Sequence, residues 1–174
     1  MTVRRYDAPG LRRVVRAHPG PVVLGPGPGD PRDAHDPRLR GLRALTAELL
    51  RGHRHGLLGV CLGNELLAAE LGLPLVRKDQ PFQGAQERID LFGEAHTVGF
   101  YNSFTARCDA ATADRLARSG VDLARDPASG DVHALRAPGA AGVQFHPESV
   151  LTLEGTRVLA NLLAAIQTPG DRAR

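Results

Sequence analysis

Short apolar runs alternate with amphipathic stretches through the first half of this 174-residue chain. Leucines at helical spacing predict an amphipathic helix over residues 37–51. Residues 57–60 form an apolar run that is too short for a helix and is typical of a buried strand. Residues 64–71 predict a second helix, which Gly72 ends as a C-cap. This strand–helix alternation indicates a parallel α/β sheet.

Shorter strand-like segments dominate the second half and also appear near the beginning. Strands are expected over residues 2–6, 21–24, 75–78, 85–92, 97–104, 132–136 and 141–145. A final helix is expected over residues 153–166. The predicted fold class is therefore α/β, an open, mostly parallel sheet flanked by helices, with antiparallel pieces added by the later strands. Because no repeat or long linker divides the chain, we expect one domain over residues 1–168 and a disordered tail over residues 169–174.

Composition narrows the classes of function. The chain is 42% hydrophobic and 24% charged with a net charge of +3, as in an ordinary globular protein. Aromatic residues make up only 4%, too few to supply stacking platforms for single-stranded nucleic acid. No apolar run reaches the roughly 18 residues that a membrane span needs. Two cysteines cannot form a disulfide framework, so we expect a cytoplasmic protein. From the aromatic content and the short apolar runs we expect no nucleic-acid and no membrane partner.

The segment Gly59-Val60-Cys61-Leu62-Gly63 lies between a predicted strand and a predicted helix. Small residues on both sides of a central nucleophile permit the sharp turn known as a nucleophile elbow. A helix N-terminus at this point favours the thiolate of Cys61. The backbone N–H of Leu62 would then face a developing oxyanion. Two interpretations stay open on these residues alone, an activated nucleophile and a buried, inert cysteine.

His146-Pro147-Glu148 follows an apolar strand-like segment. Residues i and i+2 of an extended backbone point to the same side, and Pro147 holds His146 in an extended conformation. The imidazole and the carboxylate therefore face one way, so Glu148 can orient His146 while the ring takes and returns a proton. The alternative is a strand end that carries a surface acid.

The run from Gly25 to Pro31 alternates glycine and proline. It lacks the Lys-Ser/Thr pair of a phosphate-binding loop. Its glycines leave the backbone free of side chains, so a second N–H could point into a site from this loop. The alternative is a rigid turn without a chemical role.

These three motifs, in this order, resemble class I (triad-type) glutamine amidotransferases. Residues 83–86, 89–93 and 98–104 further resemble the amidotransferase part of chorismate-using synthases, most of all phenazine-type 2-amino-2-deoxyisochorismate or anthranilate synthases. The resemblance covers about residues 2–166. It implies a flavodoxin-like fold and a module that hydrolyses glutamine and supplies ammonia to a chorismate-binding synthase domain or subunit. It implies no cofactor in this domain, with Mg²⁺ expected only in the synthase partner.

The resemblance also implies roles for individual residues. Cys61 would attack the side-chain amide of glutamine, with His146 as proton carrier and Glu148 as its partner. Backbone amides of Gly27 and Leu62 would form the oxyanion hole. Three further residues match a segment that holds glutamine in relatives, namely Asn102, Ser103 and Phe104.

The chain departs from the family pattern at two places. Relatives carry His-Gln where this chain has Asn64-Glu65, and the glutamine of that pair contacts the substrate. Glu65 is therefore a substrate-binding candidate whose carboxylate would repel or pair with the substrate, unless it turns outward and caps the helix. Relatives also begin with a buried strand that is not evident here, which would leave an exposed sheet edge. A catalytically weak subunit that binds and stabilises a synthase partner is the alternative function.

Outside these motifs the sequence predicts little chemistry. His53 and His55 have no third ligand nearby, so a solvated loop is expected and no metal site. Cys108 is expected to be structural. The acceptor of the ammonia stays open between 2-amino-2-deoxyisochorismate, anthranilate and aminodeoxychorismate synthesis.

Overall fold

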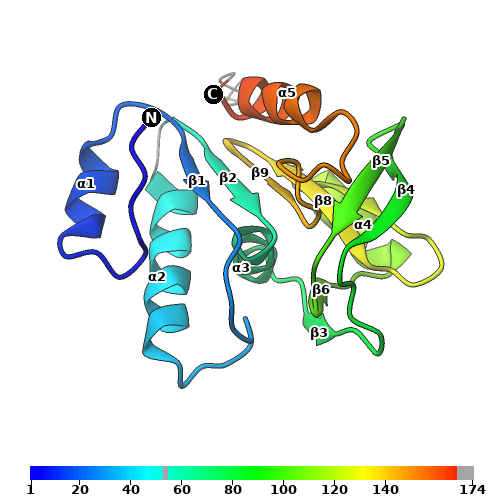
Figure 1. Ribbon diagram of the computed structural model, residues 1–174, viewed down its shortest axis with the longest axis horizontal. Coiled ribbons are helices and arrows are strands. Elements are labelled where there is room, and N and C mark those ends of the chain that lie inside the picture. Colours follow the sequence, from blue (N-terminus) through cyan, green and yellow to red (C-terminus); the bar gives the residue numbers. More distant parts are fainter. Residues whose placement is uncertain (53–54, 168–174) are drawn as a thin grey trace.

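A five-stranded sheet forms the centre of the molecule in the computed structural model, which describes residues 1–52 and 55–167 (Figure 1). The strands lie in the order β1-β2-β9-β8-β7. Their bounds are Val22–Leu24 for β1, Leu57–Val60 for β2, Ala140–Val143 for β9, Val132–Ala137 for β8 and Asp122–Arg125 for β7. β1, β2 and β9 pair in parallel, whereas β8 is antiparallel to both β9 and β7. Four of the five strands therefore run the same way, which confirms the open, mostly parallel α/β sheet.

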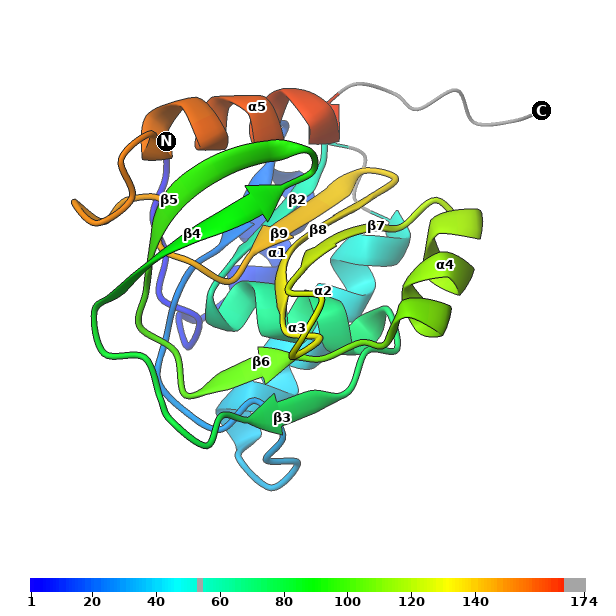
Figure 2. The ribbon, with the colours of Figure 1, turned by 90° about the vertical axis from the view of Figure 1, so that its right-hand side faces the viewer.

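Helices cover both faces of this sheet (Figure 2). α3 (Leu62–Glu70) contacts β2 and β9 on one face, and α5 (Gly155–Gln167) contacts the same strands on the other. α2 (Pro37–Gly52) packs on the outer side of α3. α1 (Leu11–Ala17) lies beside α2, where Arg12 and Arg16 form ion pairs with Glu48. α3 is therefore enclosed between the sheet and α2, and residues 62–68 are all buried.

Two small antiparallel sheets complete the fold. β4 (Ala85–Leu91) and β5 (Glu94–Phe100) form a hairpin whose turn residues Phe92 and Gly93 both have positive φ, 57° and 95°. β3 (Leu75–Arg77) pairs with β6 (Phe104–Ala106). α4 (Ala110–Arg118) then leads into β7. The end of β5 lies against the segment after β9, because the N–H of His146 donates to the carbonyl of Gly99 at 2.9 Å.

Most predicted elements are confirmed within a few residues, and the deviations have physical reasons. α3 begins at Leu62, two residues before the expected start, because Cys61 itself serves as its N-cap. The segment expected as one strand over residues 97–104 divides into β5 and β6. The strand expected over residues 2–6 is wrong: this segment is exposed and pairs with no strand of the described chain.

Three elements were not predicted: α1, α4 and β7. α4 carries a local signal, since Asp109 accepts a hydrogen bond from the backbone N–H of Thr112 as an N-cap residue should. α1 has no such signal, because its N-cap is Gly10 in the left-handed region. The tail expected over residues 169–174 and the loop residues His53 and Arg54 lie outside the described residues.

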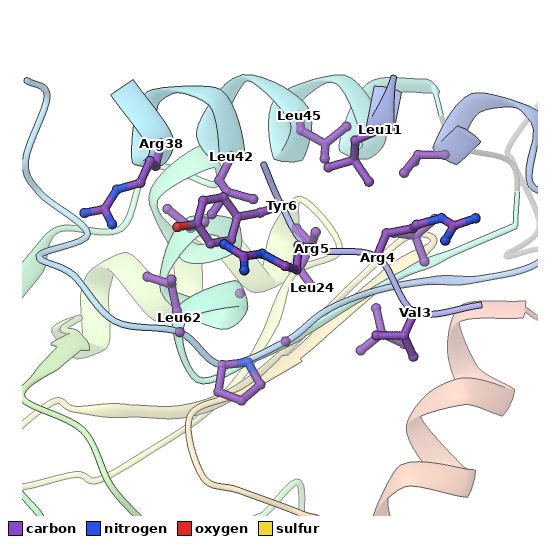
Figure 3. A pocket seen from close by; sticks show the side chains of 18 of the residues that line it. Val3, Arg4, Arg5, Tyr6, Leu11, Leu24, Arg38, Leu42, Leu45 and Leu62 are labelled. Atoms are coloured by element: carbon purple, nitrogen blue, oxygen red, sulfur yellow. The ribbon is translucent and has the colours of Figure 1, made fainter. Parts of the chain in front are cut away.

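β1 forms the edge of the sheet, and Val23 is 54% exposed there. Beside this edge lies a cavity of about 610 Å³, lined by residues 1–6, by the apolar face of α2 and by Leu24 and Leu62 (Figure 3). Tyr6 points toward Leu42 within it. Cys61, His146 and Glu148 do not line this cavity, but the two candidate oxyanion-hole residues, Gly27 and Leu62, do, so the cavity borders the candidate site.

Candidate active site

Cys61 lies on a sharp turn between β2 and α3 and has φ 52° and ψ −105°. This turn requires glycine at positions 59 and 63, because the backbone packs closely around both residues. A Cβ on Gly59 would lie 2.6 Å from the carbonyl of Gly63, and one on Gly63 would lie 2.0 Å from the carbonyl oxygen of Leu24. The Cys61 N–H donates to Val143 of β9 at 2.9 Å. The conformation is strained for a residue with a side chain, and the surrounding backbone holds it.

The thiol of Cys61 is protonated in this environment. Burial, together with the nearby carboxyl groups of Glu65 and Glu148, raises the pKa of Cys61 to about 12, and only the backbone N–H of Leu62 acts in the opposite sense. The helix terminus was expected to favour the thiolate. The Leu62 N–H at the helix start does favour the thiolate, but this effect is outweighed, because Cys61 is only 8% exposed and an acid lies one helical turn away.

His146 and Glu148 follow β9 and face each other across Pro147. The Nδ1 of His146 lies 2.8 Å from Oε1 of Glu148. Since a carboxylate only accepts, Nδ1 donates and Nε2 is left as an acceptor. Nε2 is buried and makes no hydrogen bond with the described residues. Thr152 fixes the backbone here, since its hydroxyl donates to the carbonyl of His146 and accepts from the N–H of Gly99.

A buried polar cluster surrounds the nucleophile on the other side. The side-chain amide of Gln144 donates to Oε1 of Glu65 at 3.0 Å and lies 3.9 Å from the Sγ of Cys61. Its oxygen accepts from the amide of Asn64 at 3.3 Å. Glu65 is 4% exposed, so it does not turn outward as a helix cap. Burial raises the pKa of Glu65 to about 8, with the hydrogen bond from Gln144 opposing and the charge of Asp30 adding to the rise.

The candidate oxyanion-hole residues are adjacent. Gly27 lies in the loop after β1, and a Cβ added to it would be 3.0 Å from the Cδ2 of Leu62. The backbone N–H of Leu62 is close enough to Cys61 to stabilise its thiolate. Both backbone segments therefore border the same elbow, and their role as donors stays a prediction.

The three residues expected to hold glutamine lie between β5 and β6. Asn102 is buried and donates to the carbonyl of Phe104 at 2.6 Å, while its Oδ1 is buried and unpaired. The backbone carbonyl of Ser103 accepts from the backbone N–H of Lys78. The ring of Phe104 lies under the guanidinium of Arg32, 4.9 Å from its centroid. Their roles stay predictions.

Two residues of the site were not singled out from the sequence, although both lie within the motifs. Gln144 bridges Glu65 and Cys61. Tyr101 stacks edge-on against His146 at 5.1 Å and its hydroxyl lies 3.2 Å from Ser149. The only available signal was position, since Tyr101 precedes Asn102 and Gln144 lies two residues before His146. Cys108 is buried and its thiol contacts the carbonyl of Asp109, as a structural cysteine would.

Metal-binding clusters and membrane-spanning helices are both absent from the described part of the chain. Residues 1–52 and 55–167 contain no group of three or more acidic, histidine or cysteine side chains arranged to hold a metal ion. The same residues include no helix that is long and apolar enough to cross a bilayer.

The structure combines an open α/β sheet, a cysteine on a strand–helix elbow, and a histidine–carboxylate pair after a neighbouring strand. This combination is typical of enzymes that use a cysteine nucleophile. The comparison with protein families specifies it further. The family model "Glutamine amidotransferase class-I" matches residues 1–166, and the chain belongs to this family.

Named relatives agree with this assignment. A protein of Pseudomonas fluorescens named "Anthranilate synthase, phenazine specific" is 48% identical over 155 residues, covering 86% of this chain and 24% of the relative. "Anthranilate synthase component 2, pyocyanine specific" of Pseudomonas aeruginosa is 36% identical over 148 residues, covering 82% of this chain and 68% of the relative. The chain thus spans about a quarter of the first relative's length.

Solved structures support the fold. The glutaminase domain of CTPS from Trypanosoma brucei, with bound acivicin, has a TM-score of 0.65 at 16% identity, covering 94% of this chain and 78% of that one. A glutamine amidotransferase from Thermotoga maritima has a TM-score of 0.59 at 18% identity, covering 85% of this chain and 75% of that one. At these identities the likeness is one of fold.

Proposed function

We propose that this chain hydrolyses glutamine and supplies the ammonia to a chorismate-aminating synthase of the 2-amino-2-deoxyisochorismate or anthranilate type. The observation that carries the proposal is that the strained elbow of Cys61 and the His146–Glu148 pair follow the carboxyl ends of the paired parallel strands β2 and β9, and that Nε2 of His146 has no hydrogen-bond partner among the described residues. Family membership supports the amide hydrolysis. The names of the Pseudomonas relatives support the synthase partner.

In the proposed mechanism, the Sγ of Cys61 attacks the side-chain amide carbon of glutamine while its proton passes to Nε2 of His146. Backbone N–H groups of Leu62 and Gly27 hold the oxyanion of the tetrahedral intermediate. His146 returns the proton to the departing nitrogen, which leaves as ammonia. Water then hydrolyses the thioester with His146 as base, releasing glutamate. Each step uses side chains and backbone groups of this chain and water. We expect Mg²⁺ only in the synthase partner.

The test is glutamine-dependent ammonia release by the chain, alone and co-expressed with a chorismate-binding synthase subunit. Cys61→Ala should abolish the release. Cys108→Ala is a matched control, because Cys108 is the second buried cysteine and lies away from the site against α4. We expect the control to retain the wild-type rate. Identification of the product from chorismate by mass spectrometry then distinguishes the acceptor.

Absence of ammonia above the Cys61→Ala level, in both settings, would overturn the proposal. If the chain released no ammonia but still stabilised the synthase subunit without glutamine, the non-catalytic alternative would be favoured. The buried acid beside the nucleophile is the feature that motivates this alternative, since it opposes thiolate formation.

A further inference from the structure

Glu65 is a buried carboxyl group in the first turn of α3, a helix of mostly apolar residues. Its backbone N–H donates to the carbonyl of Cys61 at 3.0 Å, so the two side chains are one helical turn apart. Only 4% of the residue is exposed. Among the ion pairs of residues 1–52 and 55–167, none involves Glu65. A buried carboxylate without a cationic partner is unfavourable, so the neutral acid is the favoured form.

Gln144 joins this acid to the nucleophile. Asn64 donates to the Gln144 oxygen, which directs the Gln144 NH₂ group toward Oε1 of Glu65 at 3.0 Å and toward the Sγ of Cys61 at 3.9 Å. One amide group therefore serves both acidic side chains. A negative charge on either side chain attracts this shared donor and disfavours a second negative charge on the other.

The other charged groups around the pair act in the same sense. Asp30, in the loop after β1, raises the pKa of Glu65, although its own charge is stabilised by Arg32. Glu148, after β9, raises the pKa of Cys61. His146, the partner of Glu148, takes the proton in the proposed reaction. Among the described residues, neither Asp30 nor Glu148 forms an ion pair with a buried Lys or Arg side chain. We therefore expect Glu65 and Cys61 together to hold at most one negative charge.

We propose that Glu65 is a positioning residue that controls the ionisation of the nucleophile: the Glu65–Gln144–Cys61 unit favours at most one negative charge, so Cys61 becomes a thiolate readily only while Glu65 keeps its proton. This inference rests on the proposed role of Cys61 as the nucleophile. Its consequence is that the thiolate fraction, and with it glutamine hydrolysis, stops rising with pH while Glu65 ionises at mildly alkaline pH.

The first test is the rate at which iodoacetamide, an uncharged probe, alkylates Cys61 between about pH 6 and pH 10. Peptide mass spectrometry separates Cys61 from Cys108. In an isolated thiol of high pKa, the logarithm of this rate rises one-for-one with pH. In this chain we expect a shelf about one pH unit wide near the pKa of Glu65, where ionisation of the carboxyl offsets the rising pH. A straight line of unit slope in the wild-type chain would overturn the proposal.

Glu65→Gln keeps the shape of the side chain and removes its charge. Its rate should match the wild-type rate below about pH 7 and exceed it about tenfold above about pH 9, without a shelf. Glu70→Gln, at the exposed end of the same helix, is the matched control and should follow the wild type. A difference of the same size at every pH would indicate a structural effect and would overturn the proposal, as would identical curves.

Alkylation requires neither glutamine nor a synthase, so this test is independent of the proposed function. A shelf without any glutamine-dependent ammonia would contradict the enzymatic function and support the coupling. Ammonia release with a straight alkylation profile would support the function and refute the role of Glu65.

Discussion

Gly63 is the position where a single methyl group would test the geometry of the elbow most directly. It lies in the first turn of α3, two residues after Cys61 and against the end of β1. In Gly63→Ala the new Cβ would lie 2.0 Å from the carbonyl oxygen of Leu24 and 2.8 Å from its carbonyl carbon. Because both atoms are backbone, no side-chain rotation relieves the contact. The end of β1 and the start of α3 must separate by about 1 Å.

The cost follows from this separation. Overpacking a close-packed core costs about 1–3 kcal/mol. In a chain of this size each kcal/mol lowers the melting temperature by roughly 2–4 °C, so we expect a decrease of about 2–12 °C. Displacement of Leu24 also moves the loop that carries Gly27, one of the proposed oxyanion donors. A misplacement of about 1 Å in a catalytic constellation reduces turnover roughly 100-fold.

Thermal unfolding followed by circular dichroism, together with ammonia release, measures both effects. Gly41→Ala is the matched control, because Gly41 is an exposed glycine inside α2 with nothing within 4 Å of an added Cβ. Alanine there should leave the melting temperature unchanged or raise it, since alanine favours helix by up to about 1 kcal/mol. A Gly63→Ala protein that melts and turns over like the wild type would refute the clash and the steric account of the elbow.

Two further outcomes follow from the described contacts. Asp109→Ala removes the N-cap of α4 and should cost about 1 kcal/mol in thermal unfolding, whereas Asp114→Ala on the exposed part of that helix should not. The pKa of Glu65 is raised from 4.5 to about 8 in the folded chain. The fold therefore has its full stability below about pH 4.5, where the carboxyl is protonated in both the folded and the unfolded chain, and this stability is lost as pH rises to about 8. Glu65→Gln should therefore gain a few kcal/mol over the wild type between pH 5 and pH 9, and a pH-independent difference in unfolding free energy would contradict this.

The parts of the site that depend on local sequence were predictable. The elbow needs glycine at positions 59 and 63, and both glycines are visible beside Cys61 in the sequence. The contact between His146 and Glu148 follows from the extended conformation that Pro147 imposes, and the structure has these side chains 2.8 Å apart. The motifs alone were therefore enough to predict both features, although the contact of Gly63 with Leu24 of β1 is seen only in the structure.

The parts that depend on burial were not predictable. Whether Glu65 caps α3 or faces inward depends on the elements packed around α3, because α2, β3 and β6 contact it in addition to the central sheet and residues 62–68 are all buried. Its partner Gln144 is 79 residues away in sequence. The strand expected over residues 2–6 failed for a related reason. A β-branched, aromatic composition favours a strand only where another strand is available to pair with it.

The ionisation of Cys61 shows how local and tertiary effects compete. A helix N-terminus stabilises a negative charge by about 0.3–1 kcal/mol, and up to about 2 kcal/mol where it is partly buried. A rise in the thiol pKa from 9.0 to about 12 corresponds to about 4 kcal/mol against the thiolate. Burial and the neighbouring acids therefore outweigh the helix. The raised pKa of Cys61 therefore favours the thiol at neutral pH, which fits the proposed mechanism, in which the proton passes to Nε2 of His146 during attack on the substrate.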